Sequence, residues 1–188
     1  MKKSMIIMPL AMAMMLSGCA LFNRGNKSDN SNSGSNSQQQ SSGSQSGADI
    51  KSGDYTFSKS TSGLDGDKEA STTFTVGDAV QFVFATGLLC SNNYDEFGLK
   101  SNQTMTMKSL SSSLKIKKIV LDNYKYYNDC PLYAGESASG DGTVGVAAGA
   151  DADNHNKVTW ASLDGAAYTY KNTYTGNSWV FSVTVTLG

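Results

Sequence analysis

Apolar and polar residues alternate along most of the chain after Asp54, with a spacing of two rather than 3.6. A period of two is typical of a strand with one buried face. The clearest case is Ser178–Leu187, which we predict to be an antiparallel strand. Its apolar residues at alternate positions are Trp179, Phe181, Val183, Val185 and Leu187.

Further segments show the same alternation. Thr72–Phe84 is interrupted by Gly77-Asp78, a dipeptide typical of turns, so it predicts two strands. No window of 12 residues keeps a helical stripe. The other predicted strands are Asp54–Lys59, Gln103–Lys108, Leu114–Leu121, Thr143–Ala147, Lys157–Ala161 and Ala166–Lys171.

In one predicted strand the apolar residues change from even to odd positions. In Leu114–Leu121 the apolar residues move from even positions (Leu114, Ile116) to odd positions (Ile119, Leu121). One extra residue in a strand restores the facing of the side chains that follow it. We therefore predict a β-bulge at Lys117-Lys118.

About eight short strands separated by Gly, Asn and Asp turns predict an all-β fold. We expect an antiparallel β-sandwich over residues 54–188, jelly-roll-like, with an immunoglobulin-like sandwich as the alternative. The pattern loosely resembles small β-sandwich modules of bacterial surface proteins. Trp160 and Trp179 lie on alternating strands and are assigned to the core.

The first residues have the pattern of an export signal. Lys2 and Lys3 precede 12 mostly apolar residues, Met5–Leu16, which are too few for a membrane span of about 20 residues. The tetrapeptide Leu16-Ser17-Gly18-Cys19 resembles the lipobox of bacterial lipoprotein precursors. The resemblance implies that residues 1–18 are removed and that Cys19 is acylated and anchors the chain in a lipid bilayer. In the sorting rule that the resemblance implies, the residue after the acylated cysteine decides the membrane, and Ala20, which is not an aspartate, favours the outer membrane. The resemblance does not say which face of that membrane carries the protein.

A polar segment follows the cysteine. From Asn23 to Gly53, 24 of 31 residues are Ser, Gly, Asn or Gln, and Ile50 is the only large apolar residue. Such a composition buries too little apolar surface to offset the entropy of ordering. We predict that residues 19–53 form a disordered tether between the lipid and the sandwich.

The charge and the cysteines of the chain limit its candidate partners and its candidate chemistry. The chain has 15 basic and 16 acidic residues and no basic stripe, so nucleic acid is excluded as a partner. In an exported protein, Cys90 and Cys130 predict a disulfide, and two buried free cysteines are the alternative. A catalytic Cys90 is disfavoured because the only histidine, His155, is 65 positions away.

Candidate catalytic and metal-binding groups are few. His155 lies in a predicted loop, and the glutamates Glu69, Glu96 and Glu136 show no pairing, so we predict no enzyme activity. A hydrolase would need Glu96 or Asp95 in a cleft facing a second carboxylate. The loop oxygens offer a weak Ca²⁺ site, with a solvated acidic turn as the alternative, and no other cofactor is expected. These oxygens belong to Asp151, Asp153 and Asn154, with Asp141 as a further candidate.

Tyrosines gather around the two cysteines. Aromatic faces beside polar groups serve both sugar rings and protein hot spots, whereas tyrosine also packs on sheet surfaces without any ligand. We expect a non-catalytic binding or adhesion module for a glycan or protein ligand. The alternative is a structural or assembly lipoprotein that contacts another envelope protein. The candidate ligand-binding residues are Tyr94, Tyr124, Tyr126, Tyr127 and Tyr133.

Overall fold

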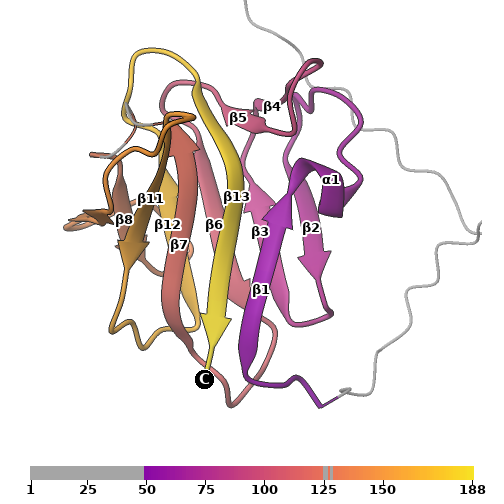
Figure 1. Ribbon diagram of the computed structural model, residues 1–188. Helices are drawn as coiled ribbons and strands as arrows, with labels where there is room; N and C mark the ends of the chain where they lie inside the picture. Colours follow the sequence, from indigo (N-terminus) through magenta and orange to yellow (C-terminus); the bar gives the residue numbers. More distant parts are fainter. Residues whose placement is uncertain (1–48, 125–126, 128) are drawn as a thin grey trace, which may run out of the picture. The chain divides into compact units, whose positions relative to one another are not determined.

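The computed structural model describes residues 49–124, 127 and 129–188. The predicted signal peptide, Cys19 and most of the predicted tether lie outside the described residues, as does Tyr126. The described part consists of two antiparallel sheets packed against each other and one short helix, α1 (Lys59–Ser62) (Figure 1). The predicted all-β sandwich is therefore confirmed. No helix in this part of the chain is long and apolar enough to cross a membrane.

Every strand pair in both sheets is antiparallel. The first sheet has the order β10 (Val146–Ala147), β11 (His155–Trp160), β7 (Ile116–Tyr124), β13 (Ser178–Leu187), β5 (Phe97–Leu99) and β4 (Leu88–Cys90), and β1 (Gly53–Ser58) also pairs with β13. The second sheet has the order β2 (Thr72–Val76), β3 (Val80–Phe84), β6 (Thr104–Ser109), β12 (Ala167–Lys171), β8 (Pro131–Ala134) and β9 (Thr143–Val144).

Most predicted strands are present within a residue or two of their predicted ends, but β4, β5 and β8 were not predicted. These strands have only three or four residues, which is too short for an alternation to stand out. The predicted strand Thr143–Ala147 is divided at Gly145 into β9 and β10. Because β9 and β10 belong to different sheets, this segment crosses from one layer of the sandwich to the other.

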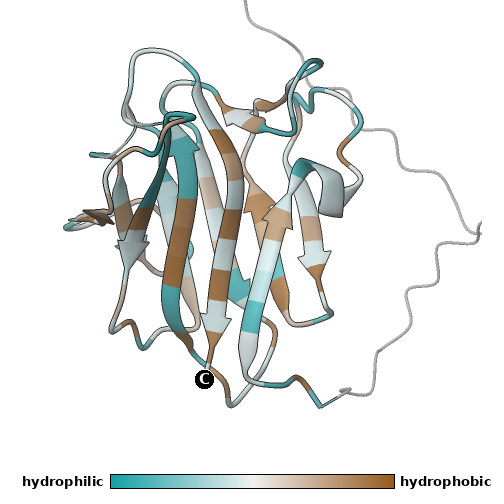
Figure 2. Cartoon of the chain, in the orientation of Figure 1, coloured by the Kyte–Doolittle hydropathy of each residue, from teal (hydrophilic) through white to brown (hydrophobic). Residues whose placement is uncertain are grey.

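An aromatic cluster joins the two sheets at one end of the core. The ring of Phe57 in β1 lies 5.1 Å from Phe82 and 5.3 Å from Phe84, both in the second sheet, and 5.0 Å from Phe97 in the first. All four side chains are fully buried, and burying each stabilises the fold by about 1.5–3 kcal/mol. Apolar bands recur along the strands that carry this core (Figure 2).

The predicted bulge in β7 is confirmed. Leu187 of β13 pairs with Ile116, whereas the preceding Thr186 pairs with Lys118, so Lys117 is the extra residue. Ile116 and Ile119 are consequently both buried although they are three positions apart. The lysines at the bulge remain at the surface, where their ammonium groups stay hydrated.

A second bulge, in β13, was not predicted. The register shifts between Val180 and Ser182, so Val180 and Val183 both enter the core. Trp179 and Phe181 are left half-buried on the other face, which corrects the assignment of Trp179 to the core. Trp179 packs instead over Gly98, where an added Cβ would lie 2.9 Å from the indole. Trp160 is buried, as predicted.

Candidate functional site

Three of the candidate tyrosines come together beside Glu96. Tyr94 belongs to the loop between β4 and β5, Tyr124 ends β7, and Tyr127 follows it. The charge of Glu96 acts on both Tyr124 and Tyr127, which places the three residues near one another. Tyr174, which the sequence did not indicate, adjoins this group: its ring meets that of Tyr127 edge-to-face at 5.1 Å.

Tyr133 does not join these tyrosines. It lies in β8 of the second sheet, where its ring would contact a Cβ placed at Gly142 at 2.9 Å. The close approach shows that Tyr133 packs against its own loop, as expected for a tyrosine on a sheet surface. Tyr126, the remaining candidate, is not among the described residues.

Glu96 is an unusual residue in this cluster because it is a carboxylate that is only 5 % exposed. Its Oε2 atom is buried and has no hydrogen-bond partner in the described part of the chain. Leaving a buried acceptor unpaired costs about 1–3 kcal/mol, and more for a charged group. Burial first, and then the negative charge of Glu96, raise the pKa of both Tyr124 and Tyr127.

The loop that carries Tyr94 and Glu96 is held by α1. The Lys59 ammonium donates hydrogen bonds to the carbonyls of Ser91 and Tyr94, the latter at 2.9 Å. The backbone N–H of Ser60 donates to Asp95 Oδ1 at 3.0 Å. These contacts hold the loop in one conformation and set Tyr94 at the surface, where it is 62 % exposed.

The other acidic residues named as candidates each have a partner of their own. Asp95 accepts the Ser60 N–H, Glu69 pairs with Lys100 at 2.9 Å and Glu136 pairs with Lys108 at 2.7 Å. These three carboxylates thus have partners other than Glu96.

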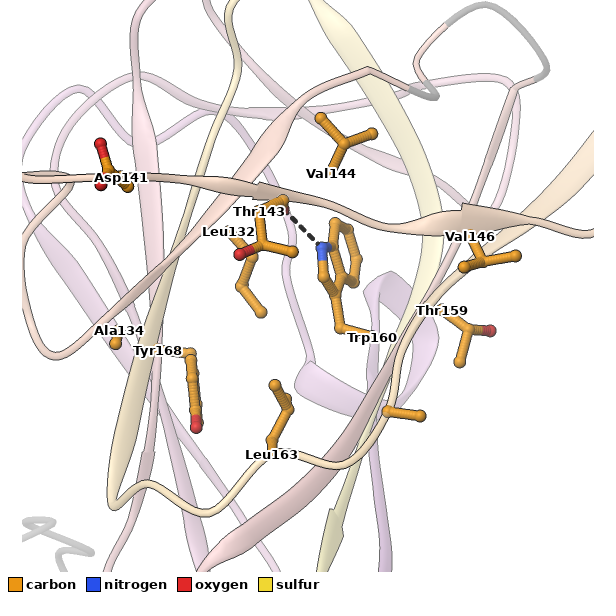
Figure 3. Close-up of a pocket in the computed structure, with 11 residues that line it drawn as sticks. Leu132, Ala134, Asp141, Thr143, Val144, Val146, Thr159, Trp160, Leu163 and Tyr168 are labelled. Atoms are coloured by element: carbon orange, nitrogen blue, oxygen red, sulfur yellow. Dashed lines mark hydrogen bonds between the residues drawn. The ribbon is translucent and has the colours of Figure 1, made fainter.

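The second candidate site is a pocket of about 260 Å³ at the edge where β9 passes into β10 (Figure 3). Trp160 forms its centre, and the indole Nε1 donates to the Thr143 carbonyl at 2.8 Å. The pocket is lined by Leu132, Ala134, Asp141, Thr143, Val144, Val146, Thr159, Trp160, Ala161, Leu163 and Tyr168.

The mouth of this pocket carries exposed apolar side chains. Val144 is 53 % and Val146 is 75 % exposed, and they flank Gly145, which packs directly on Trp160. The lining residues with polar side-chain groups include Asp141, Thr143, Thr159 and Tyr168. Pockets for drug-sized ligands hold about 300–1,000 Å³, so this one has room for a single ring or one apolar side chain.

Sequence reasoning missed this pocket because Trp160 was assigned to the core and the surrounding segments are far apart in the chain. The signal that could have indicated it is Val144-Gly145-Val146, a glycine between two apolar residues. A glycine within a strand often marks a close approach of backbone or ligand.

His155 lies at the start of β11, not in a loop as predicted. Its ring stacks on Phe181 with centroids 3.5 Å apart and planes inclined by 7°. Its Nδ1 lies 3.4 Å from Asp122 Oδ1. Burial raises the pKa of Asp122, while the nearby His155 and Lys157 oppose this increase. These contacts of His155 include no serine or cysteine nucleophile among the described residues.

The Asp/Asn loop forms a hydrogen-bonded turn. Asp151 Oδ1 accepts the backbone N–H groups of Asp153 and His155 at 3.0 and 2.9 Å, and Asn154 has a positive φ of 63°. Asp141 lies apart from this turn, at the pocket. Within the described ranges, no group of three His, Cys, Asp or Glu residues could hold a metal ion. The Ca²⁺ site at Asp151, Asp153 and Asn154 stays a prediction.

The predicted disulfide is absent, because Cys90 and Cys130 are both free thiols. Cys90 Sγ points to the carbonyl of Leu64, at 3.6 Å. Cys130 is buried beside Asn172 and Thr173, which follow β12 in the other sheet. The two thiols thus have separate sets of neighbours. The sequence could not indicate this, because an even number of cysteines does not tell how far apart their sulfur atoms lie in the fold.

Comparisons with protein-family models and with curated proteins find no match to this chain.

Proposed function

We propose that the protein is a membrane-anchored cell-envelope lipoprotein whose β-sandwich is a non-catalytic binding or adhesion module. The lipobox resemblance of Leu16-Ser17-Gly18-Cys19 supports an acylated Cys19 in the lipid bilayer, and Ala20 favours the outer membrane. The polar segment 19–53 supports a spacer that lifts the sandwich away from the headgroups. The binding part of the proposal rests on one observation, the pocket at Trp160.

The pocket offers the chemistry of a recognition site. The ring of Trp160 and the side chains of Leu163 and Tyr168 form an apolar surface, while Thr143, Thr159 and Asp141 supply hydrogen-bonding groups at the same place. A sugar ring, which has apolar faces and hydroxyl edges, matches that combination, and so does one side chain of a protein ligand. The glycan is the leading ligand class because one sugar ring offers both an apolar face to the indole and several hydroxyl groups to these polar side chains.

A specific observation also favours the second candidate function, a structural or assembly lipoprotein. The short strands β9 and β10 are edge strands of the two sheets, and residues 142–150 carry no charged side chain. Natural proteins usually protect such edges with lysine or proline, and an unprotected edge accepts a strand from another protein. The exposed valines would then contact an envelope protein, without any small ligand.

Binding is tested with Val146→Lys in the full-length chain, assayed on a glycan array and by cross-linking in intact cells. Val146 is exposed, so lysine at this position obstructs the pocket with little effect on stability. Leu110→Lys is the matched control, since Leu110 is an exposed apolar residue outside the pocket. A glycan signal lost only in Val146→Lys supports the binding module. Cross-links to an envelope protein, lost in the same variant without any glycan signal, support the assembly role.

Anchoring is tested independently by mass spectrometry of the mature N-terminus and by fractionation of cells that express Cys19→Ser. We expect acyl chains on Cys19 and release of the variant from the membrane fraction. An unmodified Cys19 in the native protein would exclude the lipoprotein part of the proposal while leaving the pocket experiment unaffected.

A further inference from the structure

The pocket at Trp160 contains one charged side chain, that of Asp141. None of the other residues that line it is acidic or basic, and residues 142–150 carry no charged side chain. Asp141 is exposed and forms no ion pair with any residue that the structure describes. The rim of the pocket thus carries a negative charge that the described part of the protein does not neutralise.

The charged residues that flank the lining residues in the chain interact with other groups. They belong to the pairs Asp164 with Lys117, Glu136 with Lys108, and Lys157 with Asp122. Since the pocket itself is lined by no lysine or arginine, a positive charge opposite Asp141 is left for the ligand to supply.

Other polar groups of the pocket are engaged within the fold. The indole Nε1 of Trp160 donates to the Thr143 carbonyl at 2.8 Å, and the Tyr168 hydroxyl accepts the N–H of Asp164 at 3.1 Å. Trp160 therefore presents its ring to a ligand rather than a hydrogen-bond donor. The polar side chains that stay available to a ligand are Asp141, Thr143 and Thr159.

The placement of these groups indicates a cyclic ligand with an amino group. In Figure 3, Asp141 and Thr159 lie on opposite sides of Trp160, so a ring placed between them meets a carboxylate on one side and a hydroxyl on the other. A volume of about 260 Å³ suits a single ring. An amino sugar combines an apolar face and hydroxyl groups with an ammonium group, which a carboxylate and an indole ring both attract.

We propose that the pocket binds a hexosamine residue whose amino group is free and protonated, in preference to a neutral or N-acetylated sugar. The ammonium group donates to the Asp141 carboxylate, the sugar hydroxyls reach Thr143 and Thr159, and the apolar face of the sugar packs on Trp160. This proposal names the ligand class of the same pocket, so it rests on the proposed glycan-binding function.

The proposal is tested with oligosaccharides of equal length and the same linkage, built from glucosamine, N-acetylglucosamine or glucose. These carry an ammonium, an acetamide or a hydroxyl group at the same ring carbon. The full-length chain is titrated by calorimetry in a nonionic detergent, at a mildly acidic pH that keeps the amine protonated. Exposed ion pairs contribute little, so we expect the glucosamine oligomer to bind about two- to fivefold more tightly than the other two, with a smaller advantage at high salt.

Variants assign this preference to the pocket. Asp141→Asn keeps the size of the side chain and removes its charge, so the ratio of glucosamine to glucose affinities should fall to about one. Asp78→Asn is the matched control, because Asp78 is an exposed aspartate in the turn between β2 and β3, outside the pocket, and its replacement should leave the ratio unchanged. Both positions are exposed, and circular dichroism verifies that both variants fold.

Several results would overturn the proposal: no binding of the glucosamine oligomer, equal affinity for the glucose oligomer, or a preference that survives in Asp141→Asn. An equal fall of the ratio in Asp78→Asn would also overturn it, because that result would indicate a general attraction of cations to the protein. Oligolysine that binds as tightly as the glucosamine oligomer, and depends on Asp141, would identify a cationic peptide as the ligand instead.

The glycan array with Val146→Lys separates this proposal from the proposed function. Neutral sugars that bind on the array and lose their signal in that variant would support the binding module even if no preference for an amino group is found. An array without any signal would remove the glycan-binding function together with the preference.

Discussion

The side-chain amide of Asn172 donates a hydrogen bond to the carbonyl of Leu99 at 2.8 Å. Leu99 ends β5 of the first sheet, and Asn172 follows β12 of the second, so this bond ties the two layers together. The same amide donates to the carbonyl of Gly176 at 2.9 Å, and Asn172 Oδ1 accepts the N–H of Tyr174 at 3.0 Å. Asn172 is fully buried, so water cannot replace these partners.

Replacing Asn172 should therefore destabilise the sandwich strongly. Asn172→Ala leaves the carbonyl of Leu99 and the N–H of Tyr174 without their partner, and each buried unpaired group costs about 1–3 kcal/mol. We expect a loss of at least about 2 kcal/mol in the free energy of unfolding, measured by urea denaturation. Asn177→Ala, at an exposed position nearby, is the control and should change stability by less than about 0.5 kcal/mol. Equal effects of the two substitutions would contradict the role of Asn172.

Gly145 is predicted to be irreplaceable where the chain crosses between the sheets. A Cβ at this position would lie 2.8 Å from the indole of Trp160 and would also overlap Val158. Gly145→Ala should cost about 1–3 kcal/mol by overpacking and change the fluorescence of Trp160 as β9 and β10 move. Gly66→Ala is the control, since no atom lies within 4 Å of its added Cβ. A Gly145→Ala protein as stable as this control would show that the crossing tolerates a side chain.

We predict that the two free thiols differ in their reactivity towards an alkylating reagent. Cys90 is partly exposed and Cys130 is buried, so iodoacetamide should alkylate Cys90 in the folded protein and Cys130 only after unfolding. Peptide mass spectrometry without reductant measures both sites. A peptide pair cross-linked through Cys90 and Cys130 would instead restore the disulfide that the sequence predicted. Cys90→Ser provides the control, because the folded variant should then take up no label in the sandwich.

Asp122 should make the sandwich less stable as the pH rises. Burial raises its pKa above the ordinary value of 3.8, so the folded protein holds this proton more tightly than the unfolded chain does. Stability from this group is present below the ordinary pKa and is lost as the pH rises through the raised one. Asp122→Asn should therefore be more stable than the native protein at pH 7, and the difference should shrink on acidification below pH 3.8.

Asp164 supplies the opposite case as a control. Its hydrogen bond and ion pair with Lys117 lower its pKa, so its contribution is present at neutral pH and is lost as the pH falls. Asp164→Asn should be slightly less stable than the native protein at pH 7. Melting temperatures of the two variants over a pH series measure both effects, and a shared sign would refute the assignment for Asp122.

The two bulges show where sequence reasoning succeeds and where it stops. The shift at Lys117 is visible in the sequence, because the apolar residues Ile116 and Ile119 change parity around it. In β13 the odd positions from Trp179 to Leu187 are all apolar, and Val180 adds one apolar residue at an even position. Only the pairing with β7 shows that Val180 enters the core while Trp179 and Phe181 leave the core face. The continuous apolar run 179–181 fits either face, so the neighbouring strands decide which of its residues are buried.

The candidate sites divide in the same way. Tyr94, Tyr124 and Tyr127 were identified from their clustering in the sequence, whereas the burial of Glu96 beside them was visible only in the folded structure. The even number of cysteines in the sandwich predicted a disulfide between Cys90 and Cys130 that the structure does not contain. The pocket at Trp160 was not predicted from the sequence.

Alternation along the chain was sufficient for the all-strand sandwich and for most of its strands, because the two faces of a strand are a property of neighbouring residues. Strand order, the second bulge, the separation of Cys90 from Cys130 and the burial of Glu96 came only with the folded arrangement. Each of these depends on contacts between segments that are distant in the chain, and such contacts are chosen by the packing of the whole core rather than by any local pattern.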